Sequence, residues 1–146
     1  MIEIIEMKDT HAEAVIEMMR TFYASDAVST NGSEEIFRAD VGNCINGSPY
    51  LEGYVFADGD RLVGYGMIAK SFSTEFGRRC IWIEDIYIIP EYRSQGLGTE
   101  FLRFVEQKFP GALLRLEAEV ENAHALHTYH KNGFTELPYT ELMKMV

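Results

Sequence analysis

The first third of the chain carries apolar side chains in a short run and then at helical spacing. Residues 2–7 are apolar and rich in isoleucine, which predicts a strand. Thr10 and Glu13 then form a capping-box pattern that opens an amphipathic helix. Ser33, followed by two glutamates, predicts the start of a second helix that ends near Gly47.

The middle of the chain has the pattern of antiparallel strands. Two runs rich in aromatic and branched residues lie within residues 50–72 and flank the turn-forming residues 58–60, which is typical of a hairpin. A third strand is predicted from Cys80 to Ile89, because Pro90 ends the apolar run.

The last third predicts a helix, a strand, a helix and further strands. Residues 101–110 show helical spacing, residues 113–120 predict a strand, and Asn122 and Gly133 bound another helix. A terminal pair of strands is predicted around Pro138. This order predicts one α/β domain over the whole chain, with a mixed, mostly antiparallel sheet flanked by helices on both faces.

Net charge narrows the choice of partner. Thirteen Lys and Arg against 23 Asp and Glu give a formal charge of −10, which disfavours nucleic acid and anionic membranes as partners. A cationic small molecule suits this balance, although solubility alone also explains it. Cys44 and Cys80 lack the spacing of a zinc site or a disulfide framework, so both are expected to be reduced thiols. With no leader pattern or membrane span, the expected compartment is the cytoplasm.

One segment of the sequence is a candidate binding site for a phosphate group. It lies where the third predicted strand of the middle region gives way to a helix. The first N–H groups of a helix have no internal partner and lie at the positive end of its dipole, and glycines leave room for a phosphate beside them. Such a turn can bind a pyrophosphate, but a plain connection that uses glycine for its backbone angles has the same sequence. The residues of this turn are Arg93, Ser94, Gln95, Gly96, Leu97, Gly98 and Thr99.

A longer match gives this turn a family context. The residues from Ile83 to Gly98 read IEDIYIIPEYRSQGLG, which resembles the acetyl-CoA motif of the GNAT superfamily of N-acetyltransferases, with its R-x-x-G-x-G core intact. A second match follows in the family's order, an Asn-led helix closed by Gly-Phe. Its residues are Asn122, Ala125, Tyr129, Gly133 and Phe134.

The resemblance implies a binding mode for acetyl-CoA, without a metal. Backbone N–H groups from Gln95 to Thr99 would hold the pyrophosphate, with Arg93 and Ser94 shaping the entrance of the loop. The family's strand at this place diverges from the next one and leaves backbone groups free for the pantetheine amides. Here that strand contributes Ile86, Tyr87 and Ile88, and the N–H of Ile88 could polarise the thioester carbonyl. A buried strand with no ligand would have the same residues.

The resemblance also implies roles for three polar side chains. Tyr129 is the candidate acid for the departing thiolate, and Asn122 is a helix N-cap that also reaches the pantetheine region. Glu84 is the candidate base, because it lies in an apolar strand where burial raises a carboxyl pKa and matches a glutamate of polyamine acetyltransferases. Strand alternation should direct Asp85 to the opposite face, and a shift of one residue would exchange the two roles.

Two further sets of polar residues lie near the part of the sequence expected to bind the acceptor. Glu117, Glu119 and Glu121 alternate along the predicted strand and could form an anionic wall, although such rows are often merely solvated. The histidines at 124, 127 and 130 lack a zinc-enzyme pattern and are expected at the surface.

The sequence therefore predicts an N-acetyltransferase that moves an acetyl group from acetyl-CoA directly to a primary amine, preferably a small cationic amine such as a polyamine or amino sugar. The alternatives are a protein or peptide amine acetyltransferase, a catalytically silent acyl-CoA sensor, and an interaction domain whose glycine turn binds nothing. A homodimer is possible, because dimers are frequent in the superfamily.

Overall fold

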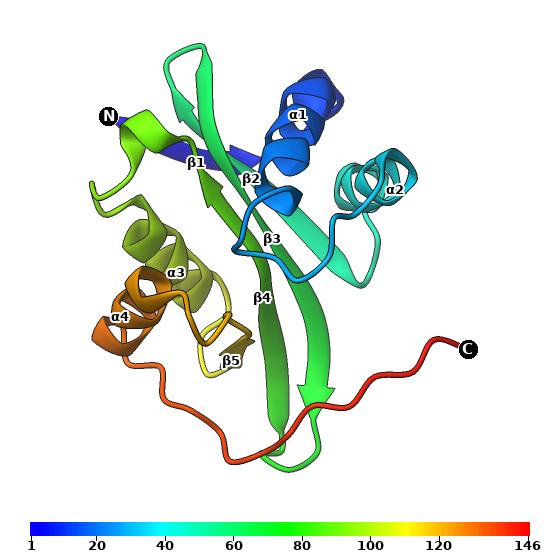
Figure 1. Ribbon diagram of the computed structural model, residues 1–146, viewed down its shortest axis with the longest axis vertical. Helices are drawn as coiled ribbons and strands as arrows, with labels where there is room; N and C mark the ends of the chain where they lie inside the picture. Colours follow the sequence, from blue (N-terminus) through cyan, green and yellow to red (C-terminus); the bar gives the residue numbers. More distant parts are fainter.

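The computed structural model describes residues 1–146 and contains a five-stranded sheet in the order β1-β2-β3-β4-β5 (Figure 1). All neighbouring strands pair antiparallel except β4 and β5, which are parallel. The predicted mixed, mostly antiparallel sheet is therefore confirmed. The strands are β1 (Ile2–Glu6), β2 (Leu51–Asp58), β3 (Arg61–Ser73), β4 (Arg78–Ile88) and β5 (Leu113–Leu116).

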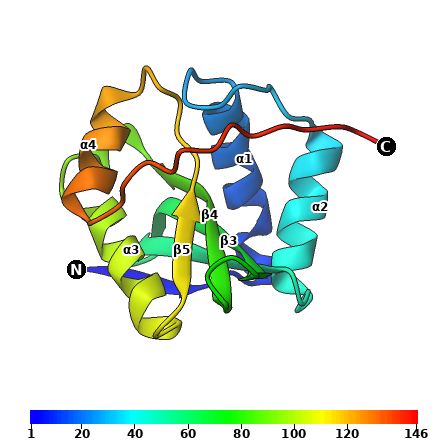
Figure 2. The same cartoon turned by 90° about the horizontal axis from the view of Figure 1, so that it is seen from below.

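Helices cover both faces of the sheet, as the sequence predicts. Helices α1 and α2 lie on one face, and α3 and α4 lie on the other (Figure 2). None of them is long and apolar enough to cross a membrane. The helices are α1 (Ala12–Tyr23), α2 (Glu34–Ile45), α3 (Leu97–Lys108) and α4 (Ala123–Lys131), with short 3-10 turns η1 (Asp9–His11) and η2 (Pro90–Tyr92).

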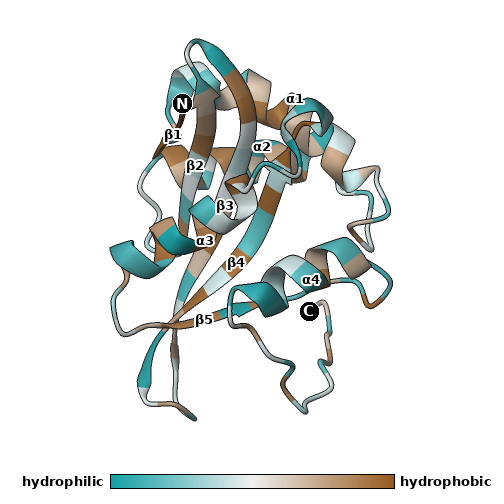
Figure 3. Ribbon diagram, turned by 90° about the vertical axis from the view of Figure 1, so that its left-hand side faces the viewer, coloured by the Kyte–Doolittle hydropathy of each residue, from teal (hydrophilic) through white to brown (hydrophobic).

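Two hydrophobic cores, one on each face of the sheet, hold the layers together. Val15 of α1 and Phe37 of α2 pack with Tyr65 of β3 in one core. In the other, Phe101 of α3 packs on Phe56 of β2, with ring centroids 5.4 Å apart. Figure 3 shows brown apolar segments along the strands and a teal segment that interrupts them in β4. Because burial of these side chains is the main favourable term in folding, the cores fix the frame that carries β4 and α3.

A β-bulge interrupts β4 at its polar segment. Met67 of β3 pairs with Asp85, but the next residue, Ile68, pairs with Ile83, so Glu84 has no partner across the ladder. A bulge inserts one residue and re-aims the side chains beside it. Asp85 is buried, and the unpaired Glu84 beside it is exposed.

The two parallel strands separate beyond the bulge. Their pairing ends at Ile83 and Leu116, although β4 continues to Ile88. The edge of β4 that faces β5 is therefore open over its last residues, as the family resemblance implies.

Local sequence signals located several element ends correctly. The Ser33 hydroxyl accepts a hydrogen bond from the N–H of Ile36 at 3.2 Å, which caps α2. Gly59 and Asp60 form the predicted hairpin turn between β2 and β3, and Gly59 has a φ of 60°. These signals succeed because each depends only on neighbouring residues.

Three predicted features are wrong. The capping box at Thr10 is absent, because Thr10 lies in η1 and α1 begins at Ala12. Strand β5 ends at Leu116 instead of residue 120, since the chain turns away from β4 there. No terminal strand pair forms: residues 134–146 have no secondary structure and pair with none of the five strands.

Candidate active site

An open cleft of about 1150 Å³ lies where β4 and β5 separate. Its walls are the end of α1 and the loop after it, the last half of β4, the segment after β5, the start of α3 and one side of α4. Every site residue predicted from the sequence lines this cleft except Gln95, whose side-chain amide donates to the carbonyl of Glu91 instead. Residues that are far apart in the chain are therefore brought to one place.

The glycine turn presents free backbone donors to the cleft. Gly96 is the N-cap of α3 with a φ of 84°, a left-handed conformation that favours glycine. No side chain caps this end, and the first helical hydrogen bond runs from the N–H of Glu100 to the carbonyl of Gly96. The N–H groups of Leu97, Gly98 and Thr99 are therefore without intrahelical partners, at the positive end of the helix dipole.

The space beside these donors is open. A Cβ atom built at Gly96 or Gly98 would meet no atom within 4 Å. The turn is held firmly on its other side, because the Leu97 side chain is buried in the core and the Thr99 hydroxyl accepts a hydrogen bond from Asn132 of the α4 C-cap at 3.0 Å. Ser94 has a φ of 62°, unusual for a residue other than glycine. Rigid donors beside open space are what an anionic phosphate requires.

Arg93 lies between the glycine turn and the open edge of β4. Its Nε donates to the carbonyl of Ile88 at 2.7 Å, and its guanidinium carbon lies 5.5 Å from the ring centroid of Tyr87. The N–H of Ile89 donates to the carbonyl of Val63 in β3. Because successive backbone groups of a strand point to opposite sides, the groups of Ile88 face away from β3, toward the cleft.

Tyr129 and Asn122 line the cleft from α4. Asn122 caps the helix, since its Oδ1 accepts from the N–H of Ala125 at 3.2 Å, as predicted. The other end is a Schellman motif, in which Phe134 N–H bonds to the Tyr129 carbonyl and Gly133 N–H to the His130 carbonyl, both at 3.0 Å. The rings of Tyr129 and Phe134 pack edge to face at 6.0 Å. Burial alone raises the pKa of Tyr129, so its phenol is protonated at neutral pH.

Both carboxylates of β4 line the cleft, contrary to the expectation that only one of them would. The bulge breaks the strict alternation on which that expectation rested. Asp85 is 5% exposed and accepts hydrogen bonds from the hydroxyls of Tyr65 at 2.8 Å and Tyr23 at 3.0 Å. Burial raises the pKa of Asp85, and the two hydroxyls offset part of that rise.

Three carboxylates lie near one another without a neutralising base: Glu84 and Asp85, which line the cleft, and Asp40, which lies behind them and does not. Although Glu84 is exposed as a residue, its carboxyl is partly surrounded by protein, and this partial burial, followed by the charges of Asp85 and Asp40, raises the pKa of Glu84. Burial and then the charge of Asp85 raise the pKa of Asp40 in α2 to about 6. No lysine or arginine contributes to any of these three shifts. Glu84 also acts on Glu117 through its charge, so we call the side of the cleft lined by Glu84, Asp85, Glu117 and Glu119 its acidic end. Arg93, Lys131 and the start of α3 also line the cleft.

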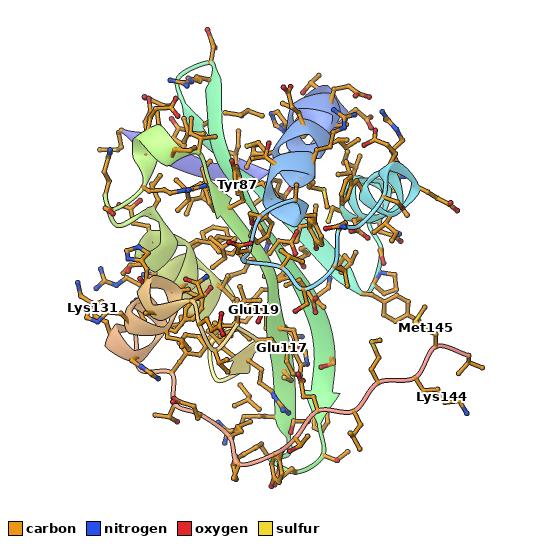
Figure 4. All side chains as sticks on the ribbon, viewed as in Figure 1. Tyr87, Glu117, Glu119, Lys131, Lys144 and Met145 are labelled. Atoms are coloured by element: carbon orange, nitrogen blue, oxygen red, sulfur yellow. The ribbon has the colours of Figure 1, made fainter.

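The predicted acidic row is only partly present. β5 ends before it, yet Glu117 and Glu119, labelled in Figure 4, line the cleft. Glu121 is not among the residues that line it. A hydrogen bond with Glu141, followed by burial and the charge of Glu141, raises the pKa of Glu117 to about 7. The Ser29 hydroxyl donates to Glu119, which ties the loop after α1 to this wall.

Sequence reasoning considered Tyr23 only as an aromatic side chain and missed its hydrogen bond with Asp85, and it missed Tyr65 and Asp40 altogether. Asp85 was the one available signal, because a buried carboxylate needs hydrogen-bond donors. Their identity depends on the fold, since 62 positions separate Tyr23 from Asp85. The three histidines of α4 are exposed as expected, although His124 and His127 border the cleft.

The pKa of Asp40 predicts a pH-dependent effect on stability. Its carboxyl titrates near pH 6 when folded and near its ordinary value of 3.8 when unfolded, so the folded state binds more protons between these values. Stability is therefore lost as pH rises through this window. We expect Asp40→Asn to raise the free energy of unfolding by about 1 kcal/mol at pH 7.5 and to leave it nearly unchanged at pH 4.

Urea denaturation at the two pH values measures this difference. Asp26→Asn, which removes an exposed carboxyl from the loop after α1, is the matched control. An equal gain at both pH values, or the same gain in the control, would show that the Asp40 carboxylate is not destabilised by its surroundings.

Comparison with known proteins identifies the family to which the chain belongs. The family model described as "Acetyltransferase (GNAT) family" matches residues 13–134. Thialysine N-epsilon-acetyltransferase of Bos taurus is 37% identical over 86 residues, which cover 57% of this chain and 50% of that protein. The Mus musculus protein of the same name is 41% identical over 51 residues, covering 35% of this chain and 29% of that protein. The matched region thus spans half or less of either relative's length.

Solved structures share the fold over nearly the full chain. A possible acetyltransferase from Clostridium difficile 630 superposes with a TM-score of 0.82 and 18% identity, covering 99% of this chain and 97% of that chain. The structure of AAC(6')-Iy in complex with a bisubstrate analog, CoA-S-monomethyl-acetylneamine, gives a TM-score of 0.80 and 14% identity, covering 100% and 99%. Since the family model matches most of the sequence and these neighbours match the architecture, the chain belongs to the GNAT acetyltransferase family.

Proposed function

We propose that the protein is an N-acetyltransferase that moves an acetyl group from acetyl-CoA directly to a primary amine. The observation that carries this proposal is the joining of two features in one cleft: the free N–H groups at the start of α3 and the open edge of β4. The first feature suits a pyrophosphate, and the second suits the amides of the pantetheine arm. An interaction domain would have no need of both.

We propose a role for each polar group in the transfer. Glu84 accepts a proton from the incoming ammonium group, which makes the amine nitrogen nucleophilic. The nitrogen then bonds to the thioester carbonyl carbon, and the N–H of Ile88 stabilises the negative oxygen. As the C–S bond breaks, Tyr129 donates its proton to the thiolate and regains one from the nitrogen. The net products are an amide, a thiol and one released proton.

The acidic end of the cleft favours a small cationic acceptor. Glu84, Asp85, Glu117 and Glu119 face this end, and opposite charges attract most strongly where water is partly excluded. The relatives named for thialysine and the neighbour bound to an acetylneamine analog both concern amines. We therefore propose that a polyamine, an amino sugar or an amino acid with a side-chain amine is the acceptor.

Calorimetry with acetyl-CoA, followed by an amine panel, tests the proposed function. We expect saturable binding of acetyl-CoA and release of free thiol with at least one of spermidine, an aminoglycoside or thialysine. A basic peptide of similar charge is the comparison substrate. Turnover with the peptide alone would reverse the proposed acceptor class, and acetyl-CoA binding without turnover of any amine would favour an acyl-CoA sensor.

Glu84→Gln tests the assignment of the base. The Glu84 carboxylate is the active form, and its pKa is raised, so kcat of the unaltered protein should rise with pH through that pKa. We expect the variant to lose this limb of the pH profile and about 10- to 100-fold in kcat.

Glu106→Gln removes an exposed carboxylate of α3 and is the matched control. If Glu84→Gln keeps the shape of the pH profile, then Glu84 is not the base, and Asp85 is the next group to test because it also lines the cleft.

A further inference from the structure

The backbone of the glycine turn does not hold the turn in shape by itself. The N–H groups of Ser94, Gln95 and Gly96 form no hydrogen bond with another backbone group. Ser94 and Gly96 both have left-handed backbone angles, with φ of 62° and 84°. A residue other than glycine keeps such an angle only where its surroundings hold it there. The shape of the turn therefore depends on groups outside it.

The hairpin turn between β2 and β3 contacts the residues just before the glycine turn. It lies beside η2 at one end of the sheet (Figure 1). Asp58, the last residue of β2, accepts a hydrogen bond from the hydroxyl of Tyr92 at 2.6 Å. Arg61, the first residue of β3, donates to the carboxylate of Glu91 at 2.7 Å, and its guanidinium carbon lies 5.6 Å from the ring centroid of Tyr92. We call these contacts of Asp58 and Arg61 with Tyr92 and Glu91 the hairpin clamp.

The hydrogen bond of Tyr92 is the stronger half of the hairpin clamp. The side chains of Arg61 and Glu91 are 57% and 59% exposed, and an exposed ion pair contributes little to stability. The ring of Tyr92 packs against the hydrophobic core beneath α3, which fixes the position of its hydroxyl. A hydrogen bond from a hydroxyl to a carboxylate is charge-assisted and stronger than one between neutral groups. This bond with Asp58 raises the pKa of Tyr92, so the phenol keeps the proton that it donates.

The hairpin clamp holds the residues that lead directly into the free N–H groups of the turn. The N–H of Tyr92 bonds to the carbonyl of Ile89 at 3.0 Å, and the side-chain amide of Gln95 donates to the carbonyl of Glu91 at 3.2 Å. After the turn, the buried side chain of Leu97 fixes the start of α3. The turn is therefore held at both ends. A binding site that is ordered before its ligand arrives loses less conformational entropy on binding, so it binds more tightly.

We propose that Tyr92 and Asp58 are positioning residues that hold the glycine turn in the shape that binds the pyrophosphate of acetyl-CoA. This inference rests on the proposed function, which makes the turn the pyrophosphate site. Neither residue lines the cleft, so the hairpin clamp acts only through the turn. Without the clamp the turn has its binding shape for only a fraction of the time, and the apparent affinity falls by that fraction. The groups that carry out the transfer stay in place.

Calorimetry with acetyl-CoA and steady-state kinetics test the role of the hairpin clamp. We expect Tyr92→Phe, which keeps the ring and loses only the hydroxyl, to raise the Kd of acetyl-CoA by about 10-fold. The kcat at saturating acetyl-CoA should not change, because the bound molecule itself orders the turn. Asp58→Ala should have the same effect, and the double variant should bind no more weakly than either single one, since both remove the same bond.

Two further variants separate this bond from general damage to the hairpin. Asp58→Asn keeps an acceptor oxygen for the Tyr92 hydroxyl and should recover most of the affinity. Asp60→Ala removes an exposed carboxylate from the same turn and is the matched control. If Tyr92→Phe binds acetyl-CoA as tightly as Asp60→Ala does, or if its loss falls on kcat instead of affinity, the positioning role is wrong.

Backbone NMR relaxation of the ligand-free protein tests the ordering of the turn without any ligand. We expect the N–H order parameters of Ser94, Gln95 and Gly96 to be lower in Tyr92→Phe than in the unaltered protein or in Asp60→Ala. Unchanged order parameters would show that the turn is held without the hydrogen bond, and the proposed function would still stand if the unaltered protein binds acetyl-CoA. If the unaltered protein binds no acetyl-CoA, the proposed function fails and this role in binding fails with it, whatever the order parameters show.

Discussion

Gly98→Glu is expected to weaken acetyl-CoA binding by about 100-fold, equivalent to about 3 kcal/mol. Gly98 lies in the first turn of α3, where its N–H has no partner and a Cβ atom would meet open space. A glutamate there places a negative charge where the pyrophosphate would bind and fills part of the space beside the free N–H groups. Each charge-assisted hydrogen bond lost contributes about 1.5–3 kcal/mol. Isothermal titration calorimetry measures the change directly.

Protein stability separates this effect from misfolding. A negative charge near the N-terminus of a helix is favourable, so Gly98→Glu should unfold at the same temperature as the unaltered protein or a higher one. Gln107→Glu adds the same charge at an exposed position near the other end of α3 and is the matched control. If Gly98→Glu binds acetyl-CoA as tightly as this control does, the start of α3 does not hold the pyrophosphate.

The glycine turn could be predicted from sequence because its geometry is local. A free helix N-terminus needs only a strand, a turn and a helix in succession, and the residues from Arg93 to Thr99 supply them. The caps at Ser33 and Asn122 were predictable for the same reason, since each side chain bonds to an N–H three residues ahead. The order of the elements followed from hydrophobic periodicity, which also depends on neighbours.

The acidic end of the cleft was less predictable because it depends on strand register. The bulge at Glu84 changes which face each later side chain of β4 takes, and a regular pattern of apolar residues does not reveal it. Tyr23 and Tyr65 reach Asp85 only because α1 and β3 pack against that face. An alternating pattern over a short segment also does not predict which strand the segment will pair with. Residues 134–146 were therefore predicted to include a pair of strands, although they pair with no strand of the sheet.

Tyr129→Phe is expected to lower kcat by about 100-fold while leaving the dissociation constant of acetyl-CoA nearly unchanged. The phenol lies on the wall of the cleft, and burial raises its pKa, so it carries the proton that a thiolate needs at neutral pH. Phenylalanine keeps the ring contact with Phe134 and the Schellman backbone bonds, and only the hydroxyl is lost. The effect should therefore fall on turnover, measured as thiol release in single-turnover reactions with saturating acetyl-CoA.

The size of the loss distinguishes proton donation from packing. Tyr50→Phe removes a hydroxyl from a residue that is 71% exposed, outside the cleft, and should leave kcat unchanged. A group that acts only by filling space would alter affinity or stability and not the rate of the chemical step. If Tyr129→Phe turns over as fast as Tyr50→Phe, the thiolate leaves without this proton donor, because a thiol is acidic enough to depart into water. The role of α4 would then be limited to forming the wall of the cleft.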